Sequence, residues 1–208
     1  MIIHSGMNLF FDTETSGLPD NRFPADHPSQ PHIVQIAAIL TNEAGAEISS
    51  INFIIKPDGY EIPEQASRVH GITTEKAHRC GVPIKLALSS FHHLACLTTN
   101  CVAHNISFDV QMVDIEAARL GKQIEWKKRF CTMEATRNTV AIPPTSKMVA
   151  AGFNTFKSPK LIESYTHIFG KGFDDAHDAL ADVRACRDIY FWLKKQHPAS
   201  APNEQVPA

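Results

Sequence analysis

In the first quarter of the chain, apolar residues form three short runs separated by polar breaks. Residues 7–12 lead into the polar sequence Asp-Thr-Glu-Thr-Ser-Gly, and residues 33–40 and 48–56 are rich in β-branched side chains. Runs of this length and composition are typical of β-strands. Residues 42–45, between the second and third runs, are a good hairpin signal. The pattern therefore predicts three strands that form an antiparallel meander.

Beyond residue 60, helix-like segments alternate with short strand-like ones. Pro, Thr and Gly at suitable positions predict helices over residues 63–69, 74–79, 83–97, 107–120, 159–169 and 177–196. Short strands are predicted at residues 101–103 and 129–132. Residues 139–158 contain adjacent prolines and Gly152, so we expect an irregular segment that could border a substrate. A meander followed by strand–helix alternation predicts an α/β layered sheet with mixed strand directions.

The bulk composition indicates one soluble domain. The 208 residues are 43% hydrophobic and 20% charged, which is ordinary for a globular protein with a single core. We expect residues 1–196 to form this domain and the Pro-rich residues 197–208 to be a disordered tail. Five scattered cysteines without a C-x-x-C pair argue against a disulfide framework or a thiolate zinc site. With no signal peptide and no membrane-length apolar run, a cytoplasmic location with no membrane partner is expected.

The distribution of charge is more informative than its total. The net charge is only −2, yet residues 119–171 carry ten Lys or Arg against three Glu. This polarity suits an acidic catalytic pocket beside a basic track for phosphates. A solvated helix face with a polar loop would produce the same charges, so this feature alone leaves both interpretations open.

Two carboxylates mark the end of the first predicted strand. Asp12 and Glu14 are two residues apart, and on a strand such residues point to the same face. A divalent cation relieves the repulsion between adjacent carboxylates, and hard Mg²⁺ or Mn²⁺ prefers oxygen ligands. Acids at a solvated strand end are common without a metal, so Asp-x-Glu needs further support.

Two later segments supply that support. Asp109 follows a short buried strand in the first turn of a predicted helix, and Asp182 is expected one turn inside the last helix, with His177 at its start. An imidazole titrates near neutrality and could take a proton from a metal-activated water. The simpler alternatives are that Asp109 favours the helix dipole and that His177 is structural.

Together these segments resemble the motifs of one enzyme family. Residues 11–18, 103–109 and 177–182 are similar, in order, to the three motifs of the DEDDh (DnaQ-like) 3′→5′ exonucleases, with the third in its His-containing form. These enzymes belong to the ribonuclease-H-like superfamily, and the most similar type is the proofreading epsilon subunit of bacterial DNA polymerase III. Residues 69–73, Val-His-Gly-Ile-Thr, also match a family segment. The resemblance spans roughly residues 9–193.

The resemblance implies a fold and a mechanism. The fold would be a three-layer α/β/α arrangement with a central mixed five-stranded sheet whose first three strands are antiparallel. Asp12, Glu14, Asp109 and Asp182 would hold two Mg²⁺ or Mn²⁺ ions per active site, with His177 as general base. The enzyme would remove nucleoside 5′-monophosphates from single-stranded or frayed 3′ ends of DNA, in proofreading, replication or repair, with a DNA polymerase as a possible partner.

The resemblance also implies contacts with the terminal nucleotide. These would come from Thr15, Leu18, His70, Asn105 and Phe108, although Leu18 and Phe108 could instead be core residues. The chief alternative function is RNA trimming by the same acids and histidine, since DNA and RNA differ in the 2′-hydroxyl. A catalytically silent nucleic-acid-binding module is disfavoured, because all five catalytic residues are present. A zinc hydrolase is also disfavoured, because close-spaced His or Cys ligands are absent.

Overall fold

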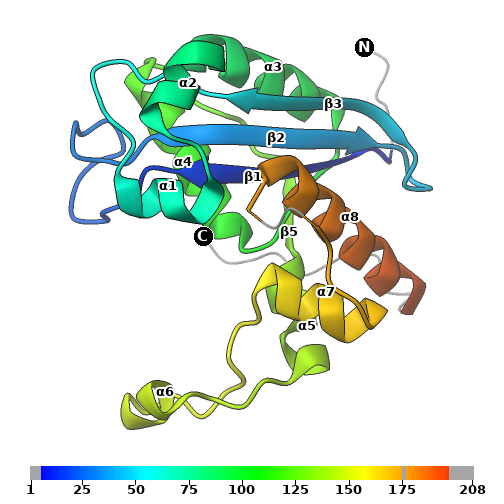
Figure 1. The fold of residues 1–208 in the computed structure, drawn as a ribbon. Coiled ribbons are helices and arrows are strands. Elements are labelled where there is room, and N and C mark those ends of the chain that lie inside the picture. The colour runs from blue at the N-terminus through cyan, green and yellow to red at the C-terminus, as the bar shows by residue number, and fades with distance from the viewer. Residues whose placement is uncertain (1–5, 175–176, 197–208) are drawn as a thin grey trace.

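The central strand of the sheet, β1 (Asn8–Thr15), sends successive apolar side chains into two different cores. In the computed structural model, which describes residues 6–174 and 177–196, Leu9 and Phe11 are buried on one face and Phe10 on the other. Successive side chains of a strand point to opposite faces, so both faces of the sheet need cover. Helices provide that cover and produce three layers (Figure 1).

The sheet has five strands in the order β3-β2-β1-β4-β5. β2 (Ile33–Thr41) pairs with β1 and with β3 (Glu47–Ile54) in antiparallel fashion. β4 (Asn100–Ala103) runs parallel to β1, and β5 (Lys128–Cys131) runs parallel to β4. The mixed five-stranded sheet with an antiparallel meander at its start is therefore confirmed.

Eight helices connect and cover these strands in the described part of the chain. They are α1 (Glu64–His70), α2 (Thr74–Cys80), α3 (Ile84–Leu97), α4 (Ile106–Arg119), α5 (Thr132–Val140), α6 (Ser146–Ala150), α7 (Leu161–Phe169) and α8 (Ala179–Gln196). α3 and α4 pack on the sheet face that holds Leu9 and Phe11, and α8 packs on the face that holds Phe10 (Figure 1). The three-layer α/β/α prediction is confirmed.

Pairing between β1 and β4 stops halfway along β1. Residues 8–10 lie opposite residues 100–102, and β4 ends at Ala103. Asn105 then adopts a left-handed conformation, with φ of 71°, and the chain turns directly into α4. Asparagine tolerates this conformation better than most residues. The second half of β1 is thus left without a strand partner on its β4 side, and α4 begins beside it.

Two boundaries near the predicted catalytic residues differ from the prediction. β1 continues to Thr15 instead of ending at Asp12, because its register with β2 extends through Glu14 and Thr15. α8 begins at Ala179 instead of His177, because His177 has a φ of 74° and cannot belong to a right-handed helix. Asp182 therefore lies in the first turn of α8 instead of one turn inside it, as predicted from a helix that begins at His177.

The segment between β5 and α7 contains helices that the sequence pattern does not reveal. The predicted short strand at 129–132 gives way at Thr132 to α5, and α6 lies inside the stretch predicted to be irregular. The buried side chains of α5 are the hydroxyl residues Thr132 and Thr136, and Thr136 Oγ1 lies 3.0 Å from Ser164 Oγ on α7. A buried face made of threonines carries no apolar periodicity, so the hydrophobic pattern of the sequence did not predict α5.

Three further expectations concern the membrane, the C-terminal tail and the cysteines. No helix among the described residues combines the length and apolarity needed to cross a bilayer. The predicted disordered tail at residues 197–208 lies outside the described residues. All five cysteines are free thiols, in agreement with the expected lack of a disulfide framework.

Phe10 should be a major contributor to stability. Its ring is fully buried and lies edge-on to Tyr190, with ring centroids 5.3 Å apart. We expect Phe10→Ala to lower the free energy of unfolding by about 3–5 kcal/mol through lost burial and a residual cavity. Phe153→Ala, at a side chain that is 62% exposed, should change it by less than about 0.5 kcal/mol. Urea unfolding followed by circular dichroism measures both, and equal losses would contradict the assignment of the core.

Candidate active site

β1 supplies two carboxylates on the sheet face that α8 covers. Asp12 and Glu14 have the same strand parity as Phe10, so all three side chains project toward α8. Both acids are partly buried. Because β1 extends to Thr15, both acids lie on regular strand. The prediction that they converge on one face therefore holds in the structure.

Asp109 reaches the same region from the first turn of α4. Its carboxylate is buried, and Oδ1 accepts hydrogen bonds from Thr13 N at 3.0 Å and from Thr13 Oγ1 at 2.8 Å. β4 ends before it can pair with Thr13, so the carboxylate takes the place of a missing strand partner. Oδ2 of Asp109 receives no hydrogen bond from the described residues and is available to a cation.

The start of α8 completes the cluster. Asp182 lies in the first turn, and its Oδ2 accepts a hydrogen bond from the backbone N–H of His177 at 3.3 Å. Potential ligand atoms of Glu14, His177 and Asp182 all lie within 4.8 Å of one another. Residues that are more than 160 positions apart in the chain thus meet at one point. The sequence-predicted group of His177 and the four acids is assembled where β1, α4 and α8 meet.

Gln35 on β2 fixes the position of α8 relative to β1. Gln35 lies directly opposite Glu14 in the β1–β2 register. Its Nε2 donates to Asp178 Oδ2 at 3.1 Å, and its Oε1 accepts from the backbone N of Ala179 at 3.3 Å. Asp178 Oδ1 in turn accepts from two backbone N–H groups in the first turn of α8. Gln35 and Asp178 therefore act together as a cap that anchors the helix beside Glu14.

The carboxylates raise one another's pKa values. Burial and then the charges of Asp109, Asp182 and Glu14 hold the pKa of Asp12 well above its usual range. Burial, followed by Asp182 and Asp109, raises the pKa of Glu14 to about 8. Burial alone is the largest cause for the other two acids, and the pKa is about 7 for Asp109 and about 6 for Asp182. Such mutual repulsion is what a bound divalent cation relieves.

The donor set fits a hard divalent cation. Four carboxylates converge, and Asp109 keeps one oxygen unpaired by the described residues. Oxygen ligands suit Mg²⁺, Mn²⁺ and similar ions, whereas a thiolate-rich or histidine-rich set would indicate a different metal. Cys186, a thiol close enough to Asp12 and Asp109 to feel their charges, is buried, and burial raises its pKa far above neutrality, so it is not a ligand candidate.

His70 lies beside the cluster at the end of α1. Its Nδ1 accepts a hydrogen bond from Ile72 N at 3.1 Å, so the neutral ring carries its hydrogen on Nε2. Burial lowers the pKa of this imidazole, which is therefore neutral at pH 7, and the neighbouring His177 lowers it further. Nε2 is buried and makes no well-formed hydrogen bond to the described residues, although the backbone of Thr15 lies close enough to raise the pKa of the ring in part. The Nε2–H group is therefore a candidate donor, and a contact between His70 and substrate stays a prediction.

Leu18 is an exposed side chain, so the alternative of core packing is wrong for it. The side chain is 82% exposed, just beyond the end of β1. Thr15 ends the strand, and its Oγ1 donates to Gly17 O at 2.8 Å, which shapes the turn that carries Leu18. An exposed apolar side chain beside an acidic cluster is free to contact a ligand. Its proposed contact with a base stays a prediction.

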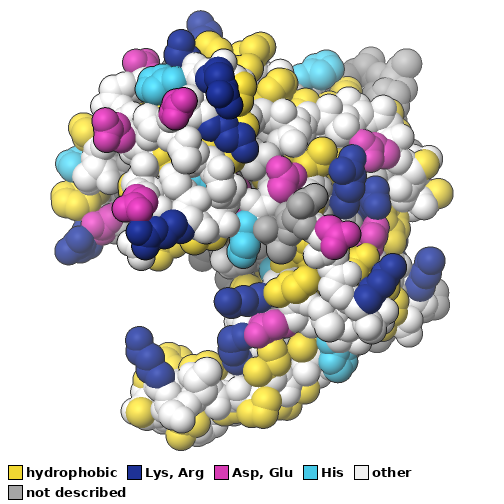
Figure 2. All heavy atoms as spheres, viewed as in Figure 1, with side chains coloured by type: hydrophobic (Ala, Val, Ile, Leu, Met, Phe, Trp, Pro, Cys, Tyr) yellow, Lys and Arg dark blue, Asp and Glu magenta, His cyan; other side chains and the backbone are white. Residues whose placement is uncertain are grey.

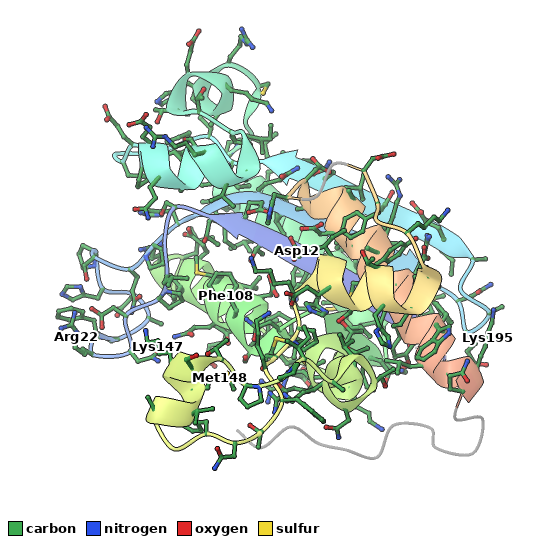
Figure 3. The ribbon with its side chains drawn as sticks, turned by 60° about the horizontal axis from the view of Figure 1, so that its bottom comes forward. Asp12, Arg22, Phe108, Lys147, Met148 and Lys195 are labelled. Carbon is green, nitrogen blue, oxygen red and sulfur yellow. The ribbon has the colours of Figure 1, made fainter. Side chains whose placement is uncertain are left out.

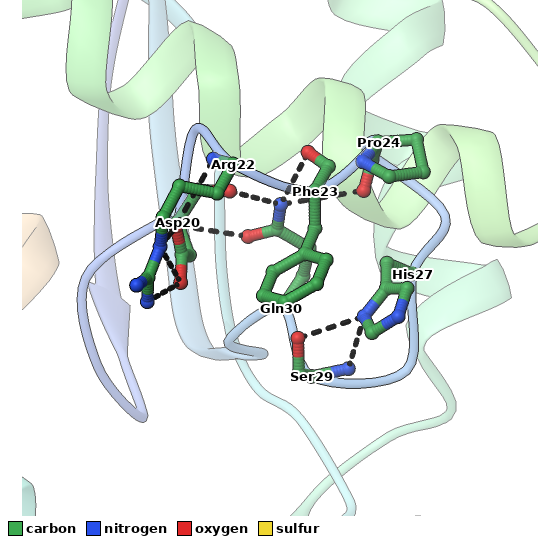
Figure 4. Close-up of polar contacts among 7 residues, drawn as sticks. All are labelled: Asp20, Arg22, Phe23, Pro24, His27, Ser29 and Gln30. Atoms are coloured by element: carbon green, nitrogen blue, oxygen red, sulfur yellow. Dashed lines mark hydrogen bonds and ion pairs between the residues drawn. The ribbon is translucent and has the colours of Figure 1, made fainter.

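The loop that follows Leu18 is held by one buried amide. Nε2 of Gln30 donates to the backbone oxygens of Asp20, Phe23 and Pro24, and its Oε1 accepts from Asp20 N (Figure 4). Gln30 is only 3% exposed, so these bonds are shielded from water. A Pro-rich loop of this length therefore has a defined conformation next to the site.

Asn105 and Phe108 occupy different environments. Asn105 is the left-handed residue that starts α4, and its side chain makes no cap hydrogen bond to that helix. Phe108 is half-buried and packs against the core between the sheet and α4. Figure 3 shows Phe108 and Asp12 in the central part of the same view. The structure thus supports a packing role for Phe108, while a contact with substrate stays a prediction for both residues.

Both ring nitrogens of His104 are used in hydrogen bonds within the fold. Its Nδ1 lies 3.0 Å from Thr132 Oγ1 and its Nε2 lies 3.0 Å from Pro159 O. Since Pro159 O can only accept, Nε2 carries the hydrogen and Nδ1 accepts from Thr132. Burial lowers the pKa of the ring, which favours this neutral form. His104 therefore connects the second motif to the start of α5 and to the segment before α7.

Three residues of this arrangement were missed by the sequence analysis: Thr13, Gln35 and Asp178. Gln35 did carry a signal, because it is a polar residue within a strand whose nine residues are all buried. A buried amide in an apolar strand needs hydrogen-bond partners. This requirement alone could have identified Gln35 as a residue with a specific structural role. Thr13 and Asp178 carry no comparable signal, since they differ little from other polar residues around the motifs.

The three-layer fold and the acidic cluster at the junction of β1, α4 and α8 define a nuclease domain of the ribonuclease-H-like class. A family model described as "Exonuclease" (RNase_T) matches residues 9–190. The chain belongs to this exonuclease family, and the resemblance to DEDDh exonucleases is confirmed.

Individual relatives agree with this assignment. The chain is 32% identical over 183 residues to the PolC-type DNA polymerase III of Lactococcus lactis, covering 88% of this chain and 10% of that protein. A crystal structure of E. coli exonuclease I with single-stranded DNA superposes with a TM-score of 0.73 and 24% identity, over 93% of this chain and 41% of that one. Another exonuclease I structure gives 0.72 and 25%, with coverages of 93% and 42%. The chain thus spans only part of each relative.

Glu14 should make the metal-free protein less stable as the pH rises. Its pKa is about 8 in the folded protein against 4.5 for an unperturbed group, so the folded state holds a proton that the unfolded chain releases. That contribution to stability is complete below about pH 4 and is lost as the pH rises through about 8. In EDTA, the free energy of unfolding of Glu14→Gln, measured with urea, should fall less steeply between about pH 5 and 8 than that of the wild type. At the upper end of this range the variant should be the more stable protein. Parallel curves for the two proteins would contradict the shifted pKa.

Gln35→Met should separate anchoring of α8 from general stability. The substitution preserves side-chain length but leaves Ala179 N and one oxygen of Asp178 without their partners, which should cost about 1–3 kcal/mol. Divalent-ion affinity or turnover should fall about 10–100-fold, because Asp182 loses its fixed position. Asn52→Ala is the matched control, since Asn52 Oδ1 accepts from the same amide at 2.9 Å but lies on β3. Equal effects of both variants on ion affinity, measured by calorimetry, would exclude the positioning role.

Proposed function

We propose that this chain is a metal-dependent 3′→5′ exonuclease that hydrolyses the terminal phosphodiester bond of DNA and releases nucleoside 5′-monophosphates. The observation that carries the proposal is the convergence of Asp12, Glu14, Asp109 and Asp182 with His177 at one point of the fold. Family membership supports the same reaction class. The silent-module alternative is disfavoured, because all five residues are present and lie together.

Each catalytic residue has a distinct part in the proposed reaction. The four carboxylates would hold two Mg²⁺ or Mn²⁺ ions, which when bound neutralise charge at the phosphate and acidify water. His177 is exposed and lies next to Glu14 and Asp182, so a ring nitrogen can take a proton from the attacking water and pass it to solvent. Thr13 keeps the Asp109 carboxylate in place, and Gln35 with Asp178 keeps Asp182 in place.

The terminal nucleotide would lie between the acids and the segments on either side of them. We assign its contacts to Thr15, Leu18, His70, Asn105 and Phe108. The exposure of Leu18 supports an apolar contact with a base. The Nε2–H of His70, which makes no well-formed hydrogen bond to the described residues, supports a polar contact with the sugar or phosphate. Neither contact depends on base identity, which suits an enzyme that degrades strands of any sequence.

DNA is the proposed substrate because of the relatives. Two of the matched exonuclease I structures are complexes, one with single-stranded DNA and one with a dT13 oligonucleotide, and the matched Lactococcus protein is a DNA polymerase. We therefore propose that the chain acts on single-stranded or frayed 3′ ends, in proofreading or repair, with a polymerase as a candidate partner. RNA remains the competing substrate, because the catalytic residues serve both sugars equally.

A panel of labelled strands tests this function. Single-stranded DNA, mismatched duplex DNA and RNA, each labelled at the 5′ end, are incubated with Mg²⁺, and products are resolved by length. We expect a ladder that shortens from the 3′ end on both DNA substrates, faster than on RNA. Asp12→Ala should abolish the ladder without lowering the melting temperature in EDTA, because it also removes like-charge repulsion. A ladder from RNA alone would replace DNA with RNA as the substrate.

His177→Ala should separate proton transfer from cation binding. We expect turnover to fall roughly 10²–10⁴-fold, the usual contribution of a positioned base. Affinity for Mn²⁺ should stay within a few-fold of the wild type, because the four carboxylates remain. The rising limb of the turnover–pH profile should disappear in the variant. If that limb persists unchanged, the water itself is titrating and His177 only orients it.

A further inference from the structure

The segment between α5 and α7 forms a closed arm that stands away from the body of the protein. Lys157 N donates to Ile142 O at 2.9 Å and joins the two ends of residues 142–157, which we call the arm. α6 lies at its tip, where the Thr145 side chain accepts from Met148 N. Figure 1 shows α6 projecting below the sheet and away from the other helices. A loop with joined ends and its own helix has a defined shape.

The surface of the arm is basic and aromatic. Residues 141–160 contain three lysines and no acid. Lys147 and Lys160 make no salt bridge to any described residue, while Lys157 pairs with Glu163 at 2.7 Å. Phe153 and Phe156 are 62% and 41% exposed. Exposed phenyl rings lower the solubility of a protein and forgo the stabilisation of burial. Their presence with unpaired lysines on a projecting segment therefore indicates a ligand.

The arm forms one side of a hollow near the active site. Figure 2 shows the molecule hollowed between the arm below and the body above, and in Figure 1 α1 and the start of α8 lie on the upper side of the same gap. α1 ends at His70, beside the catalytic cluster. At the base of the arm, Phe156 and Arg137 line a cavity of about 330 Å³. The His104–Pro159 hydrogen bond links this base to the second catalytic motif.

We propose that the arm binds the single strand on the 5′ side of the nucleotide being removed, with Phe153 and Phe156 stacking on bases. Lys147 of the arm, and Lys160 just beyond its C-terminal end, would face phosphates. This proposal rests on the proposed function, because the 3′ terminus must lie at the carboxylates for the rest of the strand to reach the arm. Stacking on phenyl rings and pairing with lysines tolerate any sequence. The arm would thus strengthen binding of long strands without selecting among bases.

A nucleic acid strand fits these features better than a protein partner. The exposed apolar side chains of the arm, Val149, Phe153 and Phe156, share its surface with lysines and no acid. The core of a protein interface is instead depleted of lysine. The absence of acids over twenty residues matches a polyanion. The hollow also leads toward the site where the strand would be cut, a relation that a protein docking surface does not require.

Binding without turnover gives the first test. In EDTA, fluorescence anisotropy of a labelled oligo-dT of about 20 nucleotides should show a Kd raised about 10-fold or more by the Phe153→Ala/Phe156→Ala double variant. Lys147→Glu should weaken binding and make its salt dependence shallower. The matched controls are Leu86→Ala, at an exposed residue of α3, and Lys195→Glu, at the end of α8 (Figure 3). Unchanged affinity in the arm variants would overturn the proposal.

Turnover on two lengths of substrate gives the second test and separates the two proposals. The ratio of kcat/KM on the long oligo-dT to kcat/KM on a dinucleotide should fall about 10-fold in the arm variants and stay constant in the controls. A wild-type enzyme that cleaves neither substrate would overturn the proposed function. A wild-type enzyme that cleaves both, with a ratio unaffected by the arm variants, would overturn only the role of the arm. Loss of self-association on size exclusion, with normal strand binding, would identify the arm as a dimer contact instead.

Discussion

The mutual repulsion of four carboxylates in a small, partly buried space is the constraint to which the rest of the structure responds. Left alone, such groups would take up protons or move apart. Asp12 and Glu14 cannot separate, because they lie on a strand held by pairing with β2. Asp109 is held by two hydrogen bonds from Thr13. The rigid sheet and its two flanking helices therefore keep the acids together before any cation binds, which is the preorganisation that a catalytic metal site needs.

The break in strand pairing along β1 makes this arrangement possible. If β4 continued beside β1, the N–H of Thr13 would pair with a strand and Asp109 would have no reason to lie there. Because β4 stops and Asn105 turns the chain, a carboxylate occupies the unpaired edge. On the other side, Gln35 uses its amide to fix the first turn of α8 over the same strand. The site thus depends on polar contacts at positions where regular pairing ends.

Much of this could be predicted from the sequence, and the reasons for the failures are physical. Strand period placed Asp12 and Glu14 on one face, and motif order brought in Asp109 and Asp182. The partners that hold them were not predictable, because Thr13 and Asp109 are 96 residues apart and Gln35 and Asp178 are 143 apart. Neither pair shows any local pattern. Likewise, α5 buries threonines whose hydroxyl groups bond within and between helices, so hydrophobic periodicity could not reveal it.

The hydrogen bond from Lys157 to Ile142 has a consequence for how this domain can vary. It joins the two ends of a sixteen-residue excursion at its base. The ion pair between Lys157 and Glu163 and the cavity lined by Phe156 and Arg137 lie at this same base. Lengthening a loop with fixed ends costs only about 0.6 kcal/mol for each doubling, so residues between these ends can be added, removed or exchanged cheaply. The domain can therefore gain or lose the arm as a unit, without any change to the carboxylates of the active site.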